Sequence, residues 1–307
     1  MSKLTYDRAQ EEFLDYCSSV KGFSRNTTLA YKNDLSRASS VFKSKKISSI
    51  TLNDVSKFID APDERSRSAA TRARTVATLR SFFLFCEKEY GEQVIDIREL
   101  TLPKVPTPPA HALEESEINL LLNSFGTDDV ASRDRAVCEL LYATGARISE
   151  VHGLDTNDID YEERLIRVFG KGSKERVIPI SKIALEAVHQ YHHGARVHFL
   201  QKRKQSNATN ALFLSQRGTR LSRQGLYDIV HKAAKRVGLE KKVWPHVFRH
   251  SFATHLLQHG ADMRIVQELL GHSSLSTTQR YTAVDTTRLK QLYDRSHPRA
   301  QRSKKSK

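Results

Sequence analysis

A cluster of prolines about a third of the way along the chain divides the sequence in two. The segment L-P-K-V-P-T-P-P-A occupies residues 102–110 of the 307. Each proline fixes φ and removes a backbone donor, so neither a helix nor an inner strand continues through this segment. The sequence therefore predicts two domains, residues 1–101 and 111–298, joined by an extended linker. Residues 299–307 are predicted to form a basic tail without a fold of its own.

The first domain is predicted to be helical. Its clearest helix lies within residues 66–90, where apolar residues recur at helical spacing and Gly91 supplies a stop. The same stretch carries several arginines, among them Arg72, Arg74 and Arg80. A basic helix of this kind is either a solvated surface or a surface that lies against a phosphate backbone.

The second domain is predicted to contain several helices and one hairpin. Residues 165–169 and 176–180 are expected to form two short strands, separated by the glycine-rich turn G-K-G-S-K. Helical periodicity marks residues 114–125, 131–143, 182–203, 222–236, 246–258, 262–270 and 276–293. The expected fold class is mainly α, with a small antiparallel β-sheet in this domain.

The charge balance indicates a polyanionic partner. The chain has 50 Lys and Arg against 35 Asp and Glu, a formal net charge of +15. Such a balance favours nucleic acid or an anionic membrane surface. A membrane is disfavoured because no run approaches the roughly 18 apolar residues of a spanning helix, and the N-terminus has no apolar signal segment. Three widely spaced cysteines in apolar helical patterns are typical of reduced core residues, so a cytoplasmic location is expected.

Five short segments place a side chain suited to phosphate binding beside a turn or a helix end. They are T-G-A-R-I-S-E at 144–150, G-K-G-S-K-E-R at 170–176, P-H-V-F-R-H at 245–250, L-L-G-H-S-S at 269–274 and S-T-T-Q-R-Y-T at 276–282. Taken singly, each has an ordinary explanation, such as a surface ion pair between Arg147 and Glu150 or a packed Tyr281. The function is indicated only by the whole set.

Together these segments supply the parts needed for transesterification of a phosphodiester. Arg147 and Arg249 present planar forks that can hold the nonbridging oxygens of one phosphate, where negative charge grows in the transition state. The phenol of Tyr281 has an ordinary pKa of about 10, so it needs positioning and a cationic site to act as a nucleophile. Lys171, at the hairpin tip, can donate a proton to a departing sugar oxygen.

Other reaction classes lack their motifs. The sequence has no HExxH, no Cys/His cluster with zinc spacing, no GxSxG and no nucleotide-binding phosphate loop. A tyrosine nucleophile also removes the need for a metal to activate water. We therefore expect no metal and no cofactor.

The order Arg147, Glu150, Lys171, His246-x-x-Arg249, His272 and Tyr281 resembles that of the tyrosine recombinase (phage integrase) family over essentially the whole chain. Further stretches are similar to the bacterial Xer recombinases of the XerC/XerD type: R-D-R-A at 133–136, H-S-F-A-T-H at 250–255, V-Q-E-L-L-G-H at 266–272, L-S-T-T-Q at 275–279 and H-P-R-A at 297–300. Ala146, Arg280 and Ala283 depart from the usual pattern without removing a reacting group. Arg280 bears on how the tyrosine segment is docked or gated.

The resemblance implies a role for each residue of the set. Tyr281 attacks the scissile phosphate and gives a 3′-phosphotyrosyl link with a free 5′-hydroxyl, while Arg147 and Arg249 hold the phosphate. Lys171 is the general acid for the leaving 5′-oxygen. His246 is a proton-transfer residue, and His272 donates a hydrogen bond to the phosphate. Glu150 orients the site and is not itself the acid.

The resemblance also implies an architecture and partners. A SAM-like helical core-binding domain and a catalytic domain would form a C-shaped clamp around double-stranded DNA that carries an inverted-repeat recombination site. DNA-contact residues are expected at Arg72, Arg74, Arg80, Arg223 and Gln224. The active form would be a tetramer, homomeric or shared with a sister Xer recombinase, that passes through a Holliday junction. An FtsK-type translocase is a further expected partner.

Alternative functions remain open. A type IB topoisomerase shares the tyrosine chemistry but relaxes DNA without exchanging partners. A non-catalytic DNA-binding protein would account for the charge, although all the expected catalytic side chains are present. Within the family, chromosome dimer resolution at a dif-like site is favoured over a mobile-element or plasmid-resolution role, because neither an arm-binding domain nor an internal insertion is visible.

Overall fold

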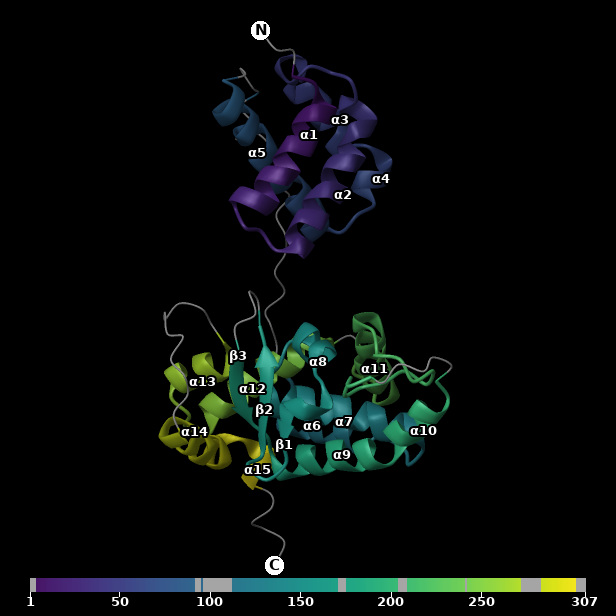
Figure 1. Ribbon diagram of the computed structural model, residues 1–307, viewed down its shortest axis with the longest axis vertical. Helices are drawn as coiled ribbons and strands as arrows, with labels where there is room; N and C mark the ends of the chain where they lie inside the picture. The colour runs from purple at the N-terminus through teal and green to yellow at the C-terminus, as the bar shows by residue number, and fades with distance from the viewer. Residues whose placement is uncertain are drawn as a thin grey trace, which may run out of the picture. The chain divides into compact units, whose positions relative to one another are not determined.

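A computed structural model describes residues 4–91, 95, 112–170, 175–203, 209–240, 242–271 and 283–301, with side chains for all of these but 283–286 and 301. The chain divides into two compact units, Met1–Pro108 and Pro109–Lys307 (Figure 1). Each unit has its own hydrophobic core. The predicted linker at 102–110 lies outside the described residues.

The first unit is a set of helices: α1 Tyr6–Asp15, α2 Arg25–Phe42, α3 Leu52–Ile59, α4 Pro62–Arg65 and α5 Ala69–Tyr90. Polar side chains cap the N-termini of the two longest helices, α2 and α5. The hydroxyl of Ser24 accepts from the Thr27 N–H at the start of α2, and Ser68 does the same for Thr71 at the start of α5. Helix α5 ends at Gly91, as predicted, in a left-handed conformation with φ 61° that glycine adopts at little cost.

Aromatic rings form the core of the first unit. The ring of Tyr6 lies edge-on to those of Phe42 and Phe82, each at 5.3 Å between centroids. Its hydroxyl donates to the carbonyl of Leu35 at 2.8 Å, so the buried polar atom is satisfied. These contacts hold α1 against α2 and α5.

The second unit adds ten helices within its described part: α6 Glu115–Leu122, α7 Asp129–Thr144, α8 Ile148–Gly153, α9 Lys182–His193, α10 Ala195–Gln201, α11 Arg223–Arg236, α12 Pro245–Gln258, α13 Met263–Leu270, α14 Ala283–Ser296 and α15 Pro298–Gln301. Its strands β1 Ile159–Asp160, β2 Leu165–Phe169 and β3 Glu175–Pro179 form one antiparallel sheet in the order β1-β2-β3. The predicted fold class, mainly α with a small antiparallel sheet, is confirmed.

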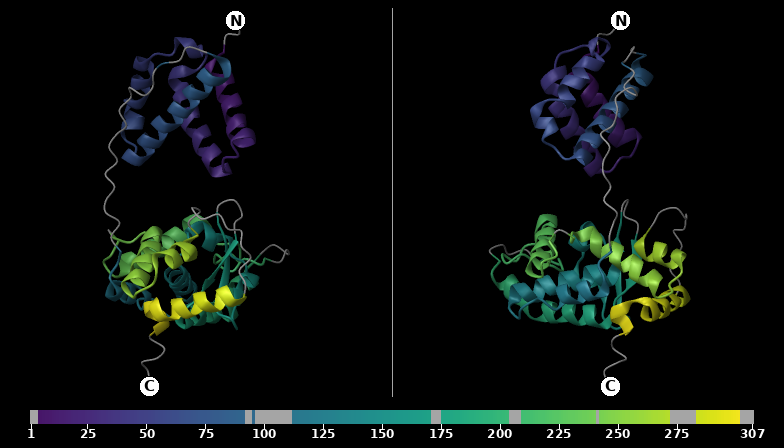
Figure 2. Two further views of the ribbon diagram at one scale, coloured as in Figure 1. Left: turned by 90° about the vertical axis from the view of Figure 1, so that its left-hand side faces the viewer. Right: turned by 180° about the vertical axis from the view of Figure 1, so that it is seen from behind.

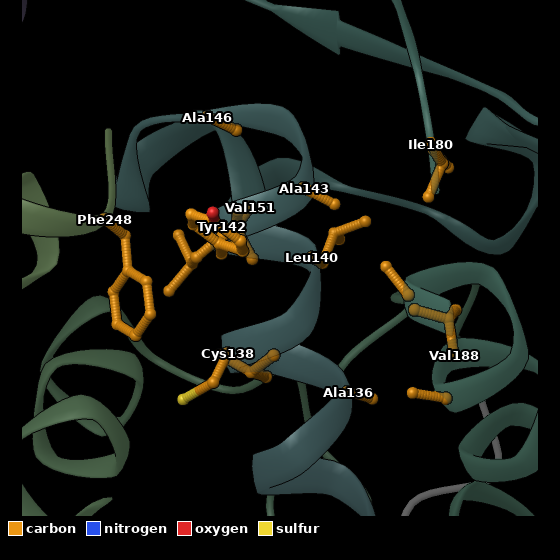
Figure 3. Packing of buried hydrophobic residues seen from close by; sticks show 14 of the residues in the cluster. Ala136, Cys138, Leu140, Tyr142, Ala143, Ala146, Val151, Ile180, Val188 and Phe248 are labelled. Atoms are coloured by element: carbon orange, nitrogen blue, oxygen red, sulfur yellow. The ribbon is translucent and has the colours of Figure 1, made fainter. Parts of the chain in front are cut away.

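Helix α7 is the centre of the second unit. Almost every residue from Ala131 to Thr144 is buried, because α9, α10, α11 and α12 pack around it. Figure 3 shows Cys138, Leu140 and Tyr142 of α7 among apolar side chains from several other elements. A helix enclosed on all sides is a rigid support, and its C-terminal end leads directly to Arg147.

The C-terminal helices dock on this core (Figure 2). The hydroxyl of Tyr293 on α14 donates to the carbonyl of Ala143 at 2.8 Å, and His297 is fully buried. Arg299, which we expected to begin a basic tail, is 5% exposed and donates to Glu139 of α7. That expectation is wrong for residues 299–301, because the buried carboxylate of Glu139 draws Arg299 into the core. Residues 302–307 lie outside the described part.

Candidate active site

Arg147 stands at the start of helix α8. Its backbone N–H donates to Oε2 of Glu150 at 2.7 Å, and its Nη1 donates to Oε1 at 2.9 Å. The preceding Gly145 has φ 59°, and a Cβ there would lie 2.5 Å from the ring of Phe252. Only glycine therefore allows the close turn between the end of α7 and Arg147. The side chain of Arg147 remains 38% exposed, so it is accessible to a ligand.

Glu150 is a buried carboxylate that serves two arginines. In addition to Arg147, it binds Arg176 of β3, with Nη1–Oε1 at 2.9 Å and Nη2–Oε2 at 2.8 Å. Burial opposes the charge of Glu150, but the hydrogen bonds and charge of Arg176 and the hydrogen bonds from Arg147 outweigh burial and lower the pKa of Glu150. Glu150 is therefore ionised at neutral pH, which suits an orienting residue and not an acid.

Sequence reasoning missed Arg176 as a site residue. Its side chain is buried, and its Nε donates to the carbonyl of Leu269 at the end of α13. The strand pattern held a signal: Arg176 is two residues before Ile178, so both face the core. A cation that faces the core at this spacing requires a buried anion, which is Glu150.

Arg249 lies close to this ion pair. Its Nη1 donates to the carbonyl of Gly145 at 2.8 Å and its Nη2 to the carbonyl of Leu270 at 2.6 Å. Burial, together with the positive charges of Arg147 and Arg176, lowers its pKa to about 10, while Glu150 opposes that shift. The guanidinium is still charged at neutral pH, but the site disfavours its charge.

The cluster has an excess of positive charge. Three guanidinium groups (Arg147, Arg176 and Arg249) face one carboxylate (Glu150), so the formal charges of these four residues sum to +2. An anion that entered this site would relieve the repulsion between the arginines. The arrangement can therefore bind a phosphate and stabilise negative charge on its oxygens.

The remaining predicted catalytic residues are placed only in part. His246 is exposed at the second position of α12, one turn before Arg249 on the same side of the helix. Lys171, His272 and Tyr281 lie outside the described residues. Their neighbours are placed: Phe169 and Glu175, which flank the segment of Lys171, pair with each other. Gly271, which precedes His272, lies against the side chain of Arg176.

The predicted DNA-contact residues fall in two separate groups. Arg72, Arg74 and Arg80 lie on α5 of the first unit, and Arg223 and Gln224 form the first turn of α11 in the second. Arg74 binds the buried Asp34 through Nε at 3.0 Å and Nη2 at 2.8 Å, so this arginine also holds α5 to α2. Arg223 and Gln224 are exposed, and Gln224 donates to Asp228 at 2.8 Å.

Two absences can be stated for the part of the chain that the structure describes. No group of three His, Cys, Asp or Glu side chains is placed to hold a metal ion. None of the described helices is both long enough and apolar enough to cross a bilayer.

Comparison with protein families defines the class of this protein. Residues 111–288 match the model of the phage integrase family, and residues 11–90 match the N-terminal SAM-like domain of phage integrases. The chain belongs to the phage integrase family of tyrosine recombinases, which cleave and rejoin DNA.

Curated relatives narrow the class to Xer-type tyrosine recombinases. Tyrosine recombinase XerD of Bifidobacterium longum is 38% identical over 304 residues, which cover 96% of this chain and 98% of the relative. Tyrosine recombinase XerC of Natranaerobius thermophilus is 36% identical over 293 residues, which cover 94% and 98%.

Solved structures share the fold at lower identity. The Tn1549 transposon integrase in complex with a circular intermediate DNA has a TM-score of 0.68 and 20% identity, with 98% of each chain covered. XerH bound to its difH substrate in a pre-cleavage complex has a TM-score of 0.63 and 23% identity, with 95% of this chain and 96% of that chain covered.

Proposed function

We propose that this chain is a site-specific recombinase that cuts DNA with Tyr281 and holds the scissile phosphate between Arg147 and Arg249. The observation that carries the proposal is the surplus of positive charge around the Glu150–Arg176 ion pair. A cluster of this charge is suited to an anion with several acceptor oxygens. Membership of a family that cleaves and rejoins DNA supports a DNA phosphodiester as that anion.

The proposed reaction needs only groups of the chain and the DNA. The phenolate oxygen of Tyr281 attacks the phosphorus, the bond from phosphorus to the 5′-oxygen breaks, and Lys171 gives its proton to that oxygen. The arginines stabilise the charge that grows on the nonbridging oxygens. In the reverse sense, the 5′-hydroxyl of a partner strand attacks the 3′-phosphotyrosyl bond and releases the tyrosine. The bond energy stays in the covalent link, so no nucleotide triphosphate is consumed.

Chain connectivity permits this chemistry. Tyr281 is ten residues beyond Gly271, which lies at the cluster, and ten residues reach at most about 35 Å when fully extended. The chain between Gly271 and Tyr281 is therefore long enough for the tyrosine to reach the arginines of its own subunit. His246, one turn before Arg249, is proposed to transfer a proton, and His272 to hydrogen-bond the phosphate.

The biological role that we propose is chromosome dimer resolution at a dif-like inverted repeat, carried out in the cytoplasm. The relatives named XerD and XerC and the net charge of +15 support this role. The two units would close around the duplex, with α5 and α11 against it, in a tetramer that is homomeric or shared with a sister recombinase and is activated by an FtsK-type translocase. Mobile-element integration is the second candidate, because the Tn1549 transposon integrase has the same fold.

The test of this role is to recover the DNA that becomes linked to Tyr281 in cells and to sequence it. We expect one short inverted repeat at a single chromosomal locus. Many unrelated sequences, together with relaxation of plasmids that lack the site, would instead support a topoisomerase. Recovery at the ends of a mobile element would support the integration role.

A further inference from the structure

A row of alternating charges joins helices α2, α4 and α5 of the first unit. Its members, in order, are Arg74, Asp34, Arg37, Glu64 and Arg67, and the N···O distances between neighbours are 2.7 to 3.0 Å. Three arginines face two carboxylates, so the formal charge of this charge row is +1. The two ends of the charge row are both arginines.

The middle of the charge row is buried and fully engaged. Asp34 is fully buried, and Glu64 is 4% exposed. Arg37 lies between them and donates through Nε to Glu64 at 2.7 Å, through Nη2 to Asp34 at 3.0 Å and through Nη1 to a backbone carbonyl at 3.2 Å. Burial opposes the charge of Asp34, but hydrogen bonds from Arg74, Thr78 and Arg37 lower its pKa. The carboxylates are therefore fixed anions that cannot turn toward solvent.

The two end arginines reach the surface. The side chains of Arg67 and Arg74 are 38% and 47% exposed. Arg74 holds Asp34 side-on, with Nε at 3.0 Å and Nη2 at 2.8 Å, and Arg67 donates through Nε to Glu64 at 2.9 Å. No hydrogen bond from Nη1 of either arginine is made within the described part of the chain. The outer edge of each guanidinium, between Nη1 and Nη2, therefore keeps donors for a ligand.

Both free edges lie near the positive end of α5. Arg67 stands immediately before Ser68, the N-cap of this helix, and Arg74 lies in its second turn. Seven residues correspond to about 10 Å of helix axis, and attachment to one charge row brings both arginines out on the same side of α5. The first turn of α5 contains no acidic residue that would offset the helix dipole. This surface is suited to more than one anionic group.

We infer that Arg67 and Arg74 form a phosphate clamp on the first unit and that Asp34 and Glu64 are positioning residues that aim them. The inference rests on the proposed function, because it takes the anion to be the backbone of double-stranded DNA. Each carboxylate holds the Nε edge of its arginine, and the Nη edge binds a phosphate. Glu150 orients a proposed phosphate-binding arginine of the second unit in the same way. Contacts to phosphates position DNA without reading its sequence.

The test measures the affinity of the full chain for two short duplexes of equal length at several salt concentrations. One duplex contains only A·T pairs, and the other is rich in G·C pairs. Each phosphate contact contributes about 0.9 to the slope of log affinity against log salt concentration. Arg67→Ala and Arg74→Ala should therefore each make the slope shallower by about 0.9 on both duplexes.

The matched control is Arg65→Ala. Arg65 is an exposed arginine close to Arg67 in the sequence, but it pairs with the exposed Asp60 and lies outside the charge row. Its removal lowers the net charge by the same amount as either clamp variant. Because no buried carboxylate aims it, we expect the salt slope of Arg65→Ala to stay close to that of the wild-type chain.

Variants of the carboxylates test the positioning role. Asp34→Asn and Glu64→Gln each make the chain more positive, which by itself would steepen the salt slope. If they aim the arginines, the slope should instead become shallower, and Asp34→Asn added to Arg74→Ala should cause little further change. Arg74→Lys keeps the charge, but a single ammonium cannot serve Asp34 and a phosphate with two separate edges, so most of the loss should remain.

Thermal unfolding of each variant shows whether it is folded. If Asp34→Asn does not fold, Glu64→Gln combined with Arg67→Ala decides the positioning role. Unchanged slopes in both alanine variants overturn the clamp, and so does a loss confined to the G·C-rich duplex, which would mean that the arginines read guanine. A wild-type chain that binds neither duplex would contradict the proposed function itself. If the wild-type chain binds and the variants match it, only the clamp fails.

Discussion

Arg176 and Glu150 form a buried, two-pronged ion pair that ties strand β3 to helix α8. Since Arg147 binds the same carboxylate, strand β3 and this proposed catalytic arginine are fixed relative to each other. The hairpin also leads into the segment that contains Lys171. One buried carboxylate therefore holds both Arg147 and the strand that follows the segment of Lys171.

Removal of this carboxylate charge should harm both the fold and the reaction. In Glu150→Gln, Arg176 keeps its charge in a buried site without a counter-ion, so we expect a loss of about 3 kcal/mol in the free energy of unfolding. Cleavage should also slow, because Arg147 loses its orienting partner. Chemical denaturation and single-turnover cleavage measure the two effects. Glu162→Gln, on the surface, is the control, and an unchanged free energy of unfolding for Glu150→Gln would show that Arg176 does not depend on this carboxylate.

Each of the two proposed catalytic arginines should be needed for cleavage but not for DNA binding. Arg147→Ala and Arg249→Ala each remove a charged contact to the phosphate, so we expect cleavage about 100-fold to 1,000-fold slower. Binding depends on many phosphate contacts and should change little. The assays are single-turnover cleavage and a binding titration at fixed salt, with the exposed Arg264→Ala as control. Near-normal cleavage by either variant would remove that arginine from the mechanism.

The proposed acid, Lys171, can be tested by changing the leaving group. A 5′-bridging sulfur departs without a proton, so Lys171→Ala should cleave such DNA at close to the wild-type rate and ordinary DNA much more slowly. The ratio of the two rates is the measurement. Arg147→Ala serves as the comparison, since a lost phosphate contact should not be rescued by sulfur. If sulfur fails to rescue Lys171→Ala, another group is the acid.

Stability should fall as the solution becomes acidic. Burial lowers the pKa of His297 to about 3, and burial also lowers the pKa of His255. Below the ordinary histidine pKa of about 6.5, these two histidines bind protons in the unfolded chain but stay neutral in the folded one. Between pH 8 and pH 5.5, His297 alone should lower the free energy of unfolding by about 1.4 kcal/mol.

Denaturant titrations at several pH values measure this slope. His255→Gln should make the slope shallower, because an amide does not titrate in this range. Replacement of the exposed His189 by Gln should leave the slope as it is. A free energy of unfolding that stays constant or rises between pH 8 and 5.5 would show that these rings are not held neutral.

The sequence was informative where the spacing of residues is short. Arg147 and Glu150 are three residues apart, and the structure joins them by two hydrogen bonds. His246 and Arg249 are likewise one helical turn apart, so both could be assigned to the same side of one helix. The hairpin strands were predicted to within a residue because glycines separate two runs of β-forming residues.

Longer-range features could not be read from local patterns. The helix predicted over 182–203 is two helices, because Gly194 adopts a non-helical conformation with φ −107° and ψ −99°. Strand β1 has two residues, too few for any alternation to be visible. The partners of Arg176 and Arg299 are 26 and 160 residues away, and charge alone suggested a hairpin tip and a tail. Pairing in three dimensions decided these positions.

The proposed reaction requires that Tyr281 becomes covalently joined to DNA. The most direct measurement is to incubate the full chain with a nicked suicide substrate that carries its site, digest the complex, and locate the modified residue by mass spectrometry. We expect a nucleotide adduct on Tyr281 and none in Tyr281→Phe, which should still bind the DNA. An adduct on another residue, or covalent complex formation by Tyr281→Phe, would contradict it.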